Sequence, residues 1–322
     1  MVDGVDTPAS NNSSQTENEV PKLKTMGLGE LLDTTFSLYR THFRTLLGIA
    51  TLYFVAMLIG ISISFSDDWI GRDAKVVLWI VTISVLSCIS VFVVSALVFA
   101  SVQAYLDGKI STGTVLKQAG RHYFRCLISA IAFGFIIFFF TFLILFVFIL
   151  LFRSFVSDSV AAFIMVLSTL AFLFLAASSF FAYWGFYISA ISVEQTTRPA
   201  LGRSDELIRG KWWRINGVML AILLLHFSVG LIFRTAVGIL LMLTEFADFS
   251  EFLATVQWMT FFQLPGNVDE FHLVIALMYL INSGIDAFTM PIWVIGCTLL
   301  YFDQRIRREG FDIEVMATRR GE

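Results

Sequence analysis

Long, uncharged, apolar stretches recur along the chain and alternate with short polar segments. Six of them reach the roughly 20 residues that an α-helix needs to cross a bilayer. They occupy residues 45–65, 76–104, 126–152, 160–193, 215–244 and 271–302. The pattern therefore predicts an all-α protein, a polytopic membrane helix bundle of six transmembrane helices.

The two ends of the chain differ from this apolar middle. Residues 1–26 are polar and almost free of large apolar side chains, so we expect a disordered cytoplasmic tail. This tail lacks the basic start and apolar core of a signal peptide, so the first span is expected to act as an uncleaved insertion signal. The six-span membrane domain is predicted over residues 27–303, and residues 304–322 are interpreted as a basic cytoplasmic C-terminal tail.

A shorter, amphipathic pattern precedes the first, third and fifth apolar stretches. Its copies end in two ring-bearing side chains and an arginine: His42-Phe43-Arg44, Tyr123-Phe124-Arg125 and Trp212-Trp213-Arg214. In the first copy, one face holds Leu28, Leu32, Thr35, Tyr39 and Phe43. Such helices lie in the headgroup plane, with cations toward anionic lipid. We therefore expect three interfacial helices, which either contact lipid headgroups or a protein partner or only fix the depth of the spans.

Composition narrows the class of protein further. The chain is 57% hydrophobic and 15% charged, with a mean hydropathy of +0.80, whereas soluble domains carry about a quarter of charged residues. An ordinary soluble enzyme is therefore excluded. The net charge of −3 says little about partners, because the position of the charges matters more than their sum, and no nucleic-acid partner is expected.

The positions of the basic residues predict the topology. The terminal segments and the second and fourth loops hold 18 of the 22 Lys and Arg residues, the first and third loops hold three, and Arg234 lies within a span. Since retained basic loops face the cytoplasm, both termini are predicted there. The loop at 245–270 has no Lys or Arg, so it is expected outside, with a helix in the outer interface.

Two charged residues, Arg234 and Asp286, lie inside predicted spans. Each costs about 2.5–3.5 kcal/mol at the bilayer centre, so each needs a partner or an aqueous cavity. They either pair with each other, or Arg234 extends to the outer surface while Asn282 or Ser283 holds Asp286. The candidate intramembrane polar site is therefore Arg234, Asn282, Ser283 and Asp286.

The last span is interrupted by Asn282-Ser283-Gly284 and by Pro291. A broken helix at a transport site shows this pattern, but a proline kink is favoured because the other half of the chain has no matching interruption. His226 is interpreted as a packing histidine, since no carboxylate neighbours it in the sequence.

Catalytic and cofactor motifs are absent from the sequence. The four histidines are scattered, the three cysteines show no C-x-x-C spacing, and there is no H-E-x-x-H, G-x-S-x-G or phosphate-loop motif. We therefore expect no cofactor and no metal, and an enzyme is the weakest class of function.

Three runs carry a family resemblance: GLGELLDTTFSLYRTHFRTLLGI near the start, RPALGRSDELIRGKWWRINGVML before the fifth span, and YFDQRIRREGFDIEVM at the end. Together they resemble an uncharacterised family of bacterial integral membrane proteins related to the membrane domain of glycerophosphoryl diester phosphodiesterases. The resemblance implies a bacterial inner-membrane location and a six-helix bundle. It implies no catalytic residues, because the soluble phosphodiesterase barrel of some relatives has no counterpart here.

The signature from Tyr301 to Asp312 also has a physical interpretation. Asp303 and Arg307 are spaced for a helical ion pair, and Gly310 is suited to end the helix. The arginines at this end, Arg305, Arg307 and Arg308, are either an anchor at the inner leaflet or a docking site for a cytoplasmic partner.

The sequence thus favours a non-enzymatic membrane component or assembly partner. The alternative is a transporter or lipid-handling protein with a cavity near Asn282, Asp286 and Arg234. Membrane lipids, with anionic headgroups, are the expected partners. The residues expected to contact these headgroups or a protein partner are Arg44, Arg125, Trp212, Trp213, Arg214, Arg305, Arg307 and Arg308.

Overall fold

The computed structural model describes residues 24–64, 72–108, 110–155, 167–169, 183, 186–191, 193, 200–244 and 273–310. Within these residues the chain forms helices joined by short connections and no strand, which confirms the all-α class. The helices are α1 (Leu28–Thr41), α2 (Phe43–Ser64), α3 (Arg72–Asp107), α4 (Thr112–Phe155), α6 (Ala200–Ile208), α7 (Trp212–Leu243) and α9 (Leu273–Glu309).

Four helices in the described part are long and apolar enough to cross a membrane, so the chain is a helical membrane protein. Their apolar segments are Phe43–Gly60, Ile80–Leu106, Trp212–Leu243 and Leu280–Glu309. The predicted third span, 126–152, lies within α4. Most of the predicted fourth span, 160–193, and all of the loop 245–270 lie outside the described residues.

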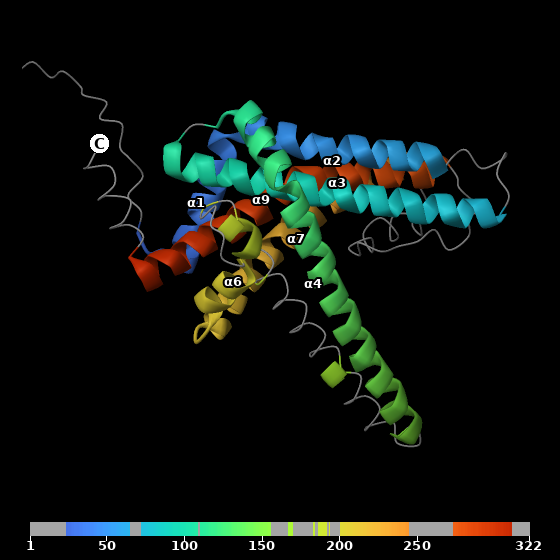
Figure 1. Ribbon diagram of the computed structural model, residues 1–322. Coiled ribbons are helices and arrows are strands. Elements are labelled where there is room, and N and C mark those ends of the chain that lie inside the picture. The colour runs from blue at the N-terminus through green and yellow to red at the C-terminus, as the bar shows by residue number, and fades with distance from the viewer. Residues whose placement is uncertain are drawn as a thin grey trace, which may run out of the picture.

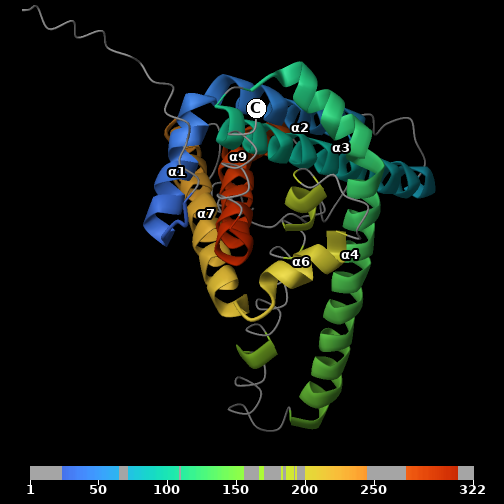
Figure 2. The same cartoon turned by 60° about the vertical axis from the view of Figure 1, so that its left-hand side comes forward.

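Helix α9 forms the centre of the bundle, where it packs against α1, α2, α3 and α7 (Figures 1 and 2). It is buried over 78% of its membrane-spanning segment, compared with 28–44% for the other three. The contact with α7 is close because Gly296 has no side chain. A Cβ there would lie 2.8 Å from Cγ2 of Ile222. Polar side chains on α9 therefore face protein along most of its length.

Helix α1 is a separate amphipathic helix, as the sequence predicts, and its buried face overlaps the expected one at Thr35 and Tyr39 but includes Leu31 in place of Leu28. Leu31, Thr35 and Tyr39 are buried, whereas Leu28 is exposed. The reason is that α1 packs against α9, and the Tyr39 hydroxyl donates a hydrogen bond to the Phe288 carbonyl at 2.8 Å. A protein contact therefore selects this face.

The second interfacial element is not a separate helix. Helix α4 runs without a break from Thr112 through the Tyr123-Phe124-Arg125 motif to Phe155. Its first part packs on α3, where the Tyr123 hydroxyl donates to the Cys88 carbonyl at 3.2 Å. Its second part then leaves the group of α2, α3 and α9 (Figures 1 and 2).

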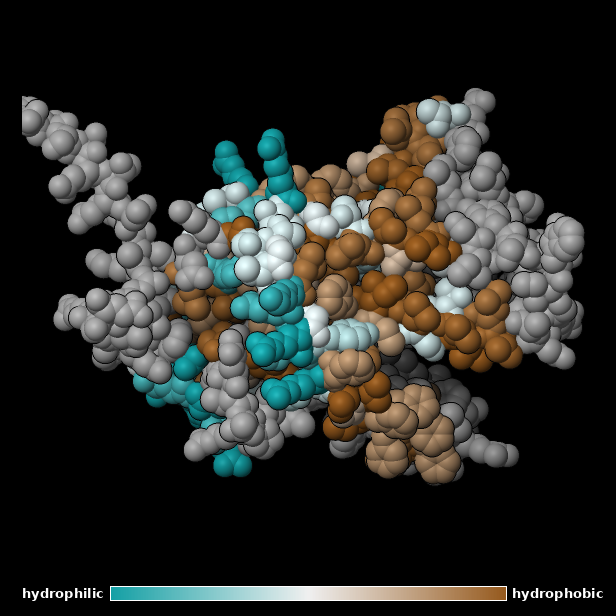
Figure 3. Space-filling view, turned by 45° about the horizontal axis from the view of Figure 1, so that its top comes forward, coloured by the Kyte–Doolittle hydropathy of each residue, from teal (hydrophilic) through white to brown (hydrophobic). Residues whose placement is uncertain are grey.

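The polar segments assigned to the tails begin inside the folded structure. Met26 is buried, and α9 continues to Glu309, after which Gly310 adopts a left-handed φ of 62°. Hydrophilic side chains gather at the end of the molecule where α9 terminates, and hydrophobic ones predominate toward the other end of the face shown in Figure 3. The described protein therefore has one distinctly polar end.

Candidate functional sites

The intramembrane polar site is held by one arginine between two helices. Arg234 on α7 is 5% exposed, and its Nε donates to Oδ1 of Asn282 on α9 at 3.1 Å. A terminal nitrogen of the same guanidinium donates to Oδ1 of Asp286 and forms an ion pair. The structure therefore selects pairing over the alternative in which Arg234 reaches the outer surface.

Helical geometry explains why one guanidinium reaches both acceptors. Asn282 and Asp286 are four residues apart, so their side chains lie one above the other on the same face of α9. An arginine fork presents several donors in fixed directions and can engage both. Asn282, which the sequence offered as a partner for Asp286, thus binds the arginine. Ser283, the fourth predicted residue, is buried next to it in the sequence.

Two further polar groups surround Asp286. Nδ1 of His226 lies 3.3 Å from the Thr289 carbonyl oxygen, and both His226 and Tyr53 interact electrostatically with Asp286. His226 makes a contact within the protein, as expected of a packing histidine, and it also lies near a carboxylate that is distant in the sequence. The two residues become neighbours because α7 and α9 pack against each other on folding.

A second polar cluster lies at the end of the bundle where α9 terminates. Its centre is Asp303, whose side chain is 0% exposed. Its carboxylate accepts hydrogen bonds from Nη2 of Arg214 at 2.8 Å, from Nε of Arg307 at 2.9 Å, and from the Met26 amide at 2.8 Å. Arg307 also donates to the Met26 carbonyl at 2.9 Å. We call these residues the Asp303 cluster.

Further arginine contacts at this end involve α6, the connection between α6 and α7, and α9. Arg203 on α6 forms an ion pair with Glu309, at 2.6 Å between Nη2 and Oε2. Arg305 approaches the same carboxylate at 3.3 Å, and Arg308 donates to the carbonyl of Arg209. The three arginines at the end of α9 therefore all make bonds within the protein, of which the sequence predicted only the pair between Arg307 and Asp303.

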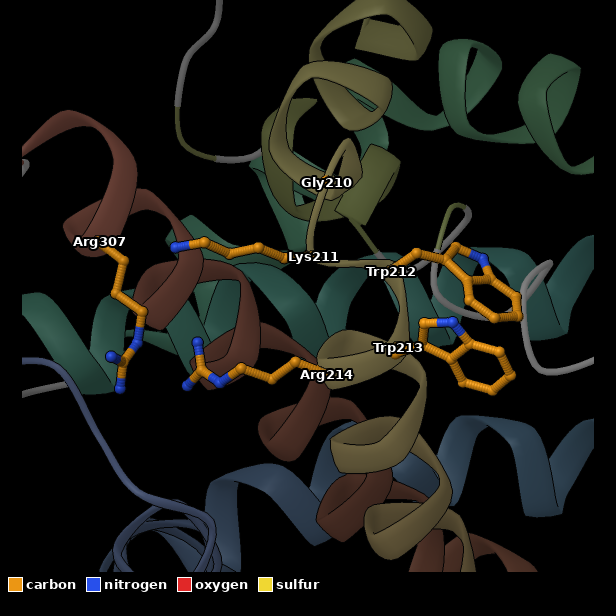
Figure 4. A pocket seen from close by; sticks show the side chains of 6 residues that line it. All are labelled: Gly210, Lys211, Trp212, Trp213, Arg214 and Arg307. Carbon is orange, nitrogen blue, oxygen red and sulfur yellow. The ribbon is translucent and has the colours of Figure 1, made fainter.

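A groove of about 620 Å³ opens beside the Asp303 cluster. Figure 4 shows the nitrogen-bearing ends of Lys211, Arg214 and Arg307 on one side of the α6–α7 connection. The indoles of Trp212 and Trp213 lie on the other side, 4.7 Å apart edge to face. Gly210 completes the lining, and we call this feature the cationic groove.

The two other ring-and-arginine motifs do not contribute to the lining of this groove. Arg44 is exposed at the start of α2, and Arg125 is exposed within α4. Near Arg125, burial lowers the pKa of His122 below its ordinary value, and the positive charges of Arg125 and Arg121 lower it further. The three motifs thus share a sequence pattern but occupy different structural settings.

No family model, curated protein or solved structure matches this chain. The fold and its four apolar helices define an all-helical membrane protein, and the family resemblance remains a prediction from the sequence.

Sequence reasoning found Trp212, Trp213, Arg214 and Arg307 but missed Lys211 and Met26. It also identified the Asp303–Arg307 pair, because four-residue spacing is a local signal. The bond from Arg214 to Asp303 joins residues 89 positions apart. The only sequence signal for this bond is that Arg214 and Asp303 are oppositely charged residues at the ends of apolar stretches.

Proposed function

We propose that this chain is a six-span protein of the bacterial inner membrane, with both termini in the cytoplasm, that acts as a non-enzymatic membrane component or assembly partner. The observation that carries the proposal is that the two charged residues of the predicted spans, Arg234 and Asp286, bind each other. This contact uses the charges to hold α7 against α9. A structural role therefore accounts for them without a reaction or a cargo.

The topology has independent support from the two ends of the described chain. The Met26 backbone bonds to Asp303 and Arg307 near the end of α9, which brings residues 277 positions apart together. An even number of spans leaves both ends on one side of the membrane. Reporter fusions to the two termini test this topology. Cytoplasmic signals from both are expected, and signals from opposite compartments would contradict it.

The second half of α4 supports a role as an assembly partner. Among the described helices, α4 packs chiefly on α3, through its first part. Its second part exposes phenylalanine side chains, with the stacked rings of Phe138, Phe142 and Phe146 at centroid distances of 6.4 Å. Rigid aromatic side chains are well suited to packing against a second membrane helix.

Photo-crosslinking tests the assembly role. A photoreactive residue at Phe142 is expected to capture one polypeptide in stoichiometric amounts, whereas the same residue at the exposed Val81 of α3 captures lipid. Stoichiometric co-purification of the same polypeptide with the unmodified chain is the second requirement. Crosslinks from Phe142 only to lipid or within the chain would contradict the proposal.

A second candidate function is transport or lipid handling at the intramembrane site. One observation favours it: the Asp286 side chain is 37% exposed although Arg234 is buried. The Asp286 side chain is therefore only partly enclosed, and it interacts electrostatically with His226 and Tyr53. Uptake and lipid-scrambling assays in proteoliposomes test this candidate. Flux that is lost in Asp286→Asn supports it, and flux that is absent or unchanged in this variant rejects it.

A further inference from the structure

We propose that the cationic groove binds the phosphate of one anionic phospholipid headgroup. This inference goes beyond the assembly role and does not rest on it, because the groove lies at the α7 and α9 ends and not on α4. The group that binds is a phosphate, and the structure favours a phospholipid over free phosphate as the molecule that carries it.

Three cations converge on the groove from two helices distant in the sequence. Lys211 and Arg214 lie at the start of α7, and Arg307 lies near the end of α9. Their charged ends lie on the same side of the α6–α7 connection (Figure 4). The buried carboxylate of Asp303 offsets one of these charges. The groove therefore keeps an excess of positive charge, which attracts an anion.

The Asp303 carboxylate also orients the two guanidinium groups before a ligand arrives. Arg214 uses one terminal nitrogen for this contact, and Arg307 uses Nε. Each guanidinium carries five N–H donors, so donors remain for a phosphate, whose oxygens match the planar fork. Lys211 forms no ion pair with any described residue. An exogenous anion would supply its missing counter-charge.

The backbone around the groove adds to this preference for an anion. Lys211 is the N-cap of α7 and its side chain provides no cap, so it leaves the first amides of this 32-residue helix available to another acceptor. Gly210 precedes it with φ of 81°, a conformation that other residues adopt only with strain. The arginine contacts to Glu309 and the Arg209 carbonyl hold this turn against α9.

The tryptophans favour a lipid over free phosphate. The membrane-spanning segment of α7 begins at Trp212, and Trp213 is 75% exposed. Indole rings at such positions lie at the headgroup level of a bilayer. The groove thus opens at the depth of lipid phosphates, and its volume of about 620 Å³ is in the usual range of small-molecule sites, about 300–1,000 Å³.

Lipid titration of the full-length protein tests the proposal. Native mass spectrometry in detergent would measure binding of phosphatidylglycerol and phosphatidylcholine to the wild type and to Lys211→Gln. Preferential binding of phosphatidylglycerol is expected. The variant should weaken it about fivefold, which corresponds to about 1 kcal/mol per base near an anionic surface.

Lys117→Gln is the matched control, because Lys117 is an exposed cation outside the groove. Its lipid binding should equal that of the wild type, and both variants should unfold at the wild-type temperature. Equal affinity for the two lipids, or equal losses in the two variants, would overturn the proposal.

Two further measurements distinguish a phospholipid from free phosphate and from a protein as the ligand of the groove. Inorganic phosphate is expected to displace phosphatidylglycerol only weakly. If it binds as tightly as the lipid, free phosphate is the ligand and the lipid assignment is wrong. If Lys211→Gln instead loses a stoichiometric protein and keeps full lipid affinity, the groove is a protein-docking site and the proposal fails. Because the assembly test uses α4, the two proposals can fail separately.

Discussion

At the scale of single residues, Asp303 is the centre of a group of polar contacts at the end of α9. Its carboxylate is fully buried and holds Arg214, Arg307 and the Met26 backbone together. Gln304, the next residue, also donates to it at 3.3 Å. If Asp303 is replaced by a neutral residue, Arg214 and Arg307 lose their counter-charge. The substitution should therefore lower the free energy of unfolding.

We predict that Asp303→Asn lowers the free energy of unfolding by about 1–3 kcal/mol, because Asp303 is fully buried but the arginines left without its charge are partly exposed. Unfolding of the purified protein in mixed detergent micelles measures this. Asp33→Asn is the control, since Asp33 is exposed on α1 and should cost little. A loss of similar size in both variants would show that Asp303 has no special structural role.

A second residue-scale prediction concerns Arg234 and Asp286. Each single substitution, Arg234→Gln or Asp286→Asn, leaves a charge without its partner inside the bundle and should destabilise the protein. The double variant removes both charges, so its loss should be clearly smaller than the sum of the single losses. A double-mutant cycle measured by unfolding in detergent tests this. Strictly additive losses would mean that the pair contributes no interaction energy.

His122 provides a prediction about pH. Because burial and the nearby arginines lower its pKa in the folded state, the unfolded chain binds the proton more readily. The contribution of His122 to stability is therefore complete above the ordinary value of 6.5 and decreases as the pH falls below it. Thermal unfolding at pH 7.5 and 5.5 should show a smaller difference for His122→Gln than for the wild type. An identical difference would contradict the assignment.

At the scale of helices, the contact between α7 and α9 depends on a missing side chain. We predict that Gly296→Ala destabilises the protein by about 1–3 kcal/mol, because the new Cβ meets Ile222. The control is Gly217→Ala on α7, where nothing lies within 4 Å of the added Cβ. That variant should be neutral or more stable by up to about 1 kcal/mol, since alanine favours helix. Unfolding measurements that rank the two variants in the opposite order would reject this packing.

Local pattern predicted some helices better than others. Helix α1 follows the sequence signal, because a polar and an apolar face at helical spacing are local features. The second interfacial element merges with the span that follows it, because no glycine, proline or cap interrupts α4 between Tyr123 and Cys126. A ring-and-arginine motif therefore does not by itself mark a helix boundary.

At the scale of the whole molecule, the amino-acid sequence by itself determined that this is a helical membrane protein. As helices, the apolar stretches are long enough to cross a bilayer. Inside the hydrocarbon, the backbone N–H and C=O groups of such a stretch can be satisfied by the hydrogen bonds of an α-helix. The sequence also determined two local contacts, the Asp303–Arg307 pair and the helix end at Gly310.

Only the tertiary structure decided which helices are neighbours. Helices such as α7 are apolar on all sides, so periodicity does not reveal which face meets protein and which meets lipid. The helix faces that meet protein are selected partly by close packing, as where Gly296 leaves room for Ile222. They are also selected by polar contacts between residues that are distant in the sequence. The bond between Arg234 and Asn282 joins positions 48 apart, and that between Met26 and Asp303 joins positions 277 apart. The cationic groove and the intramembrane pair exist only because packing brings those positions together.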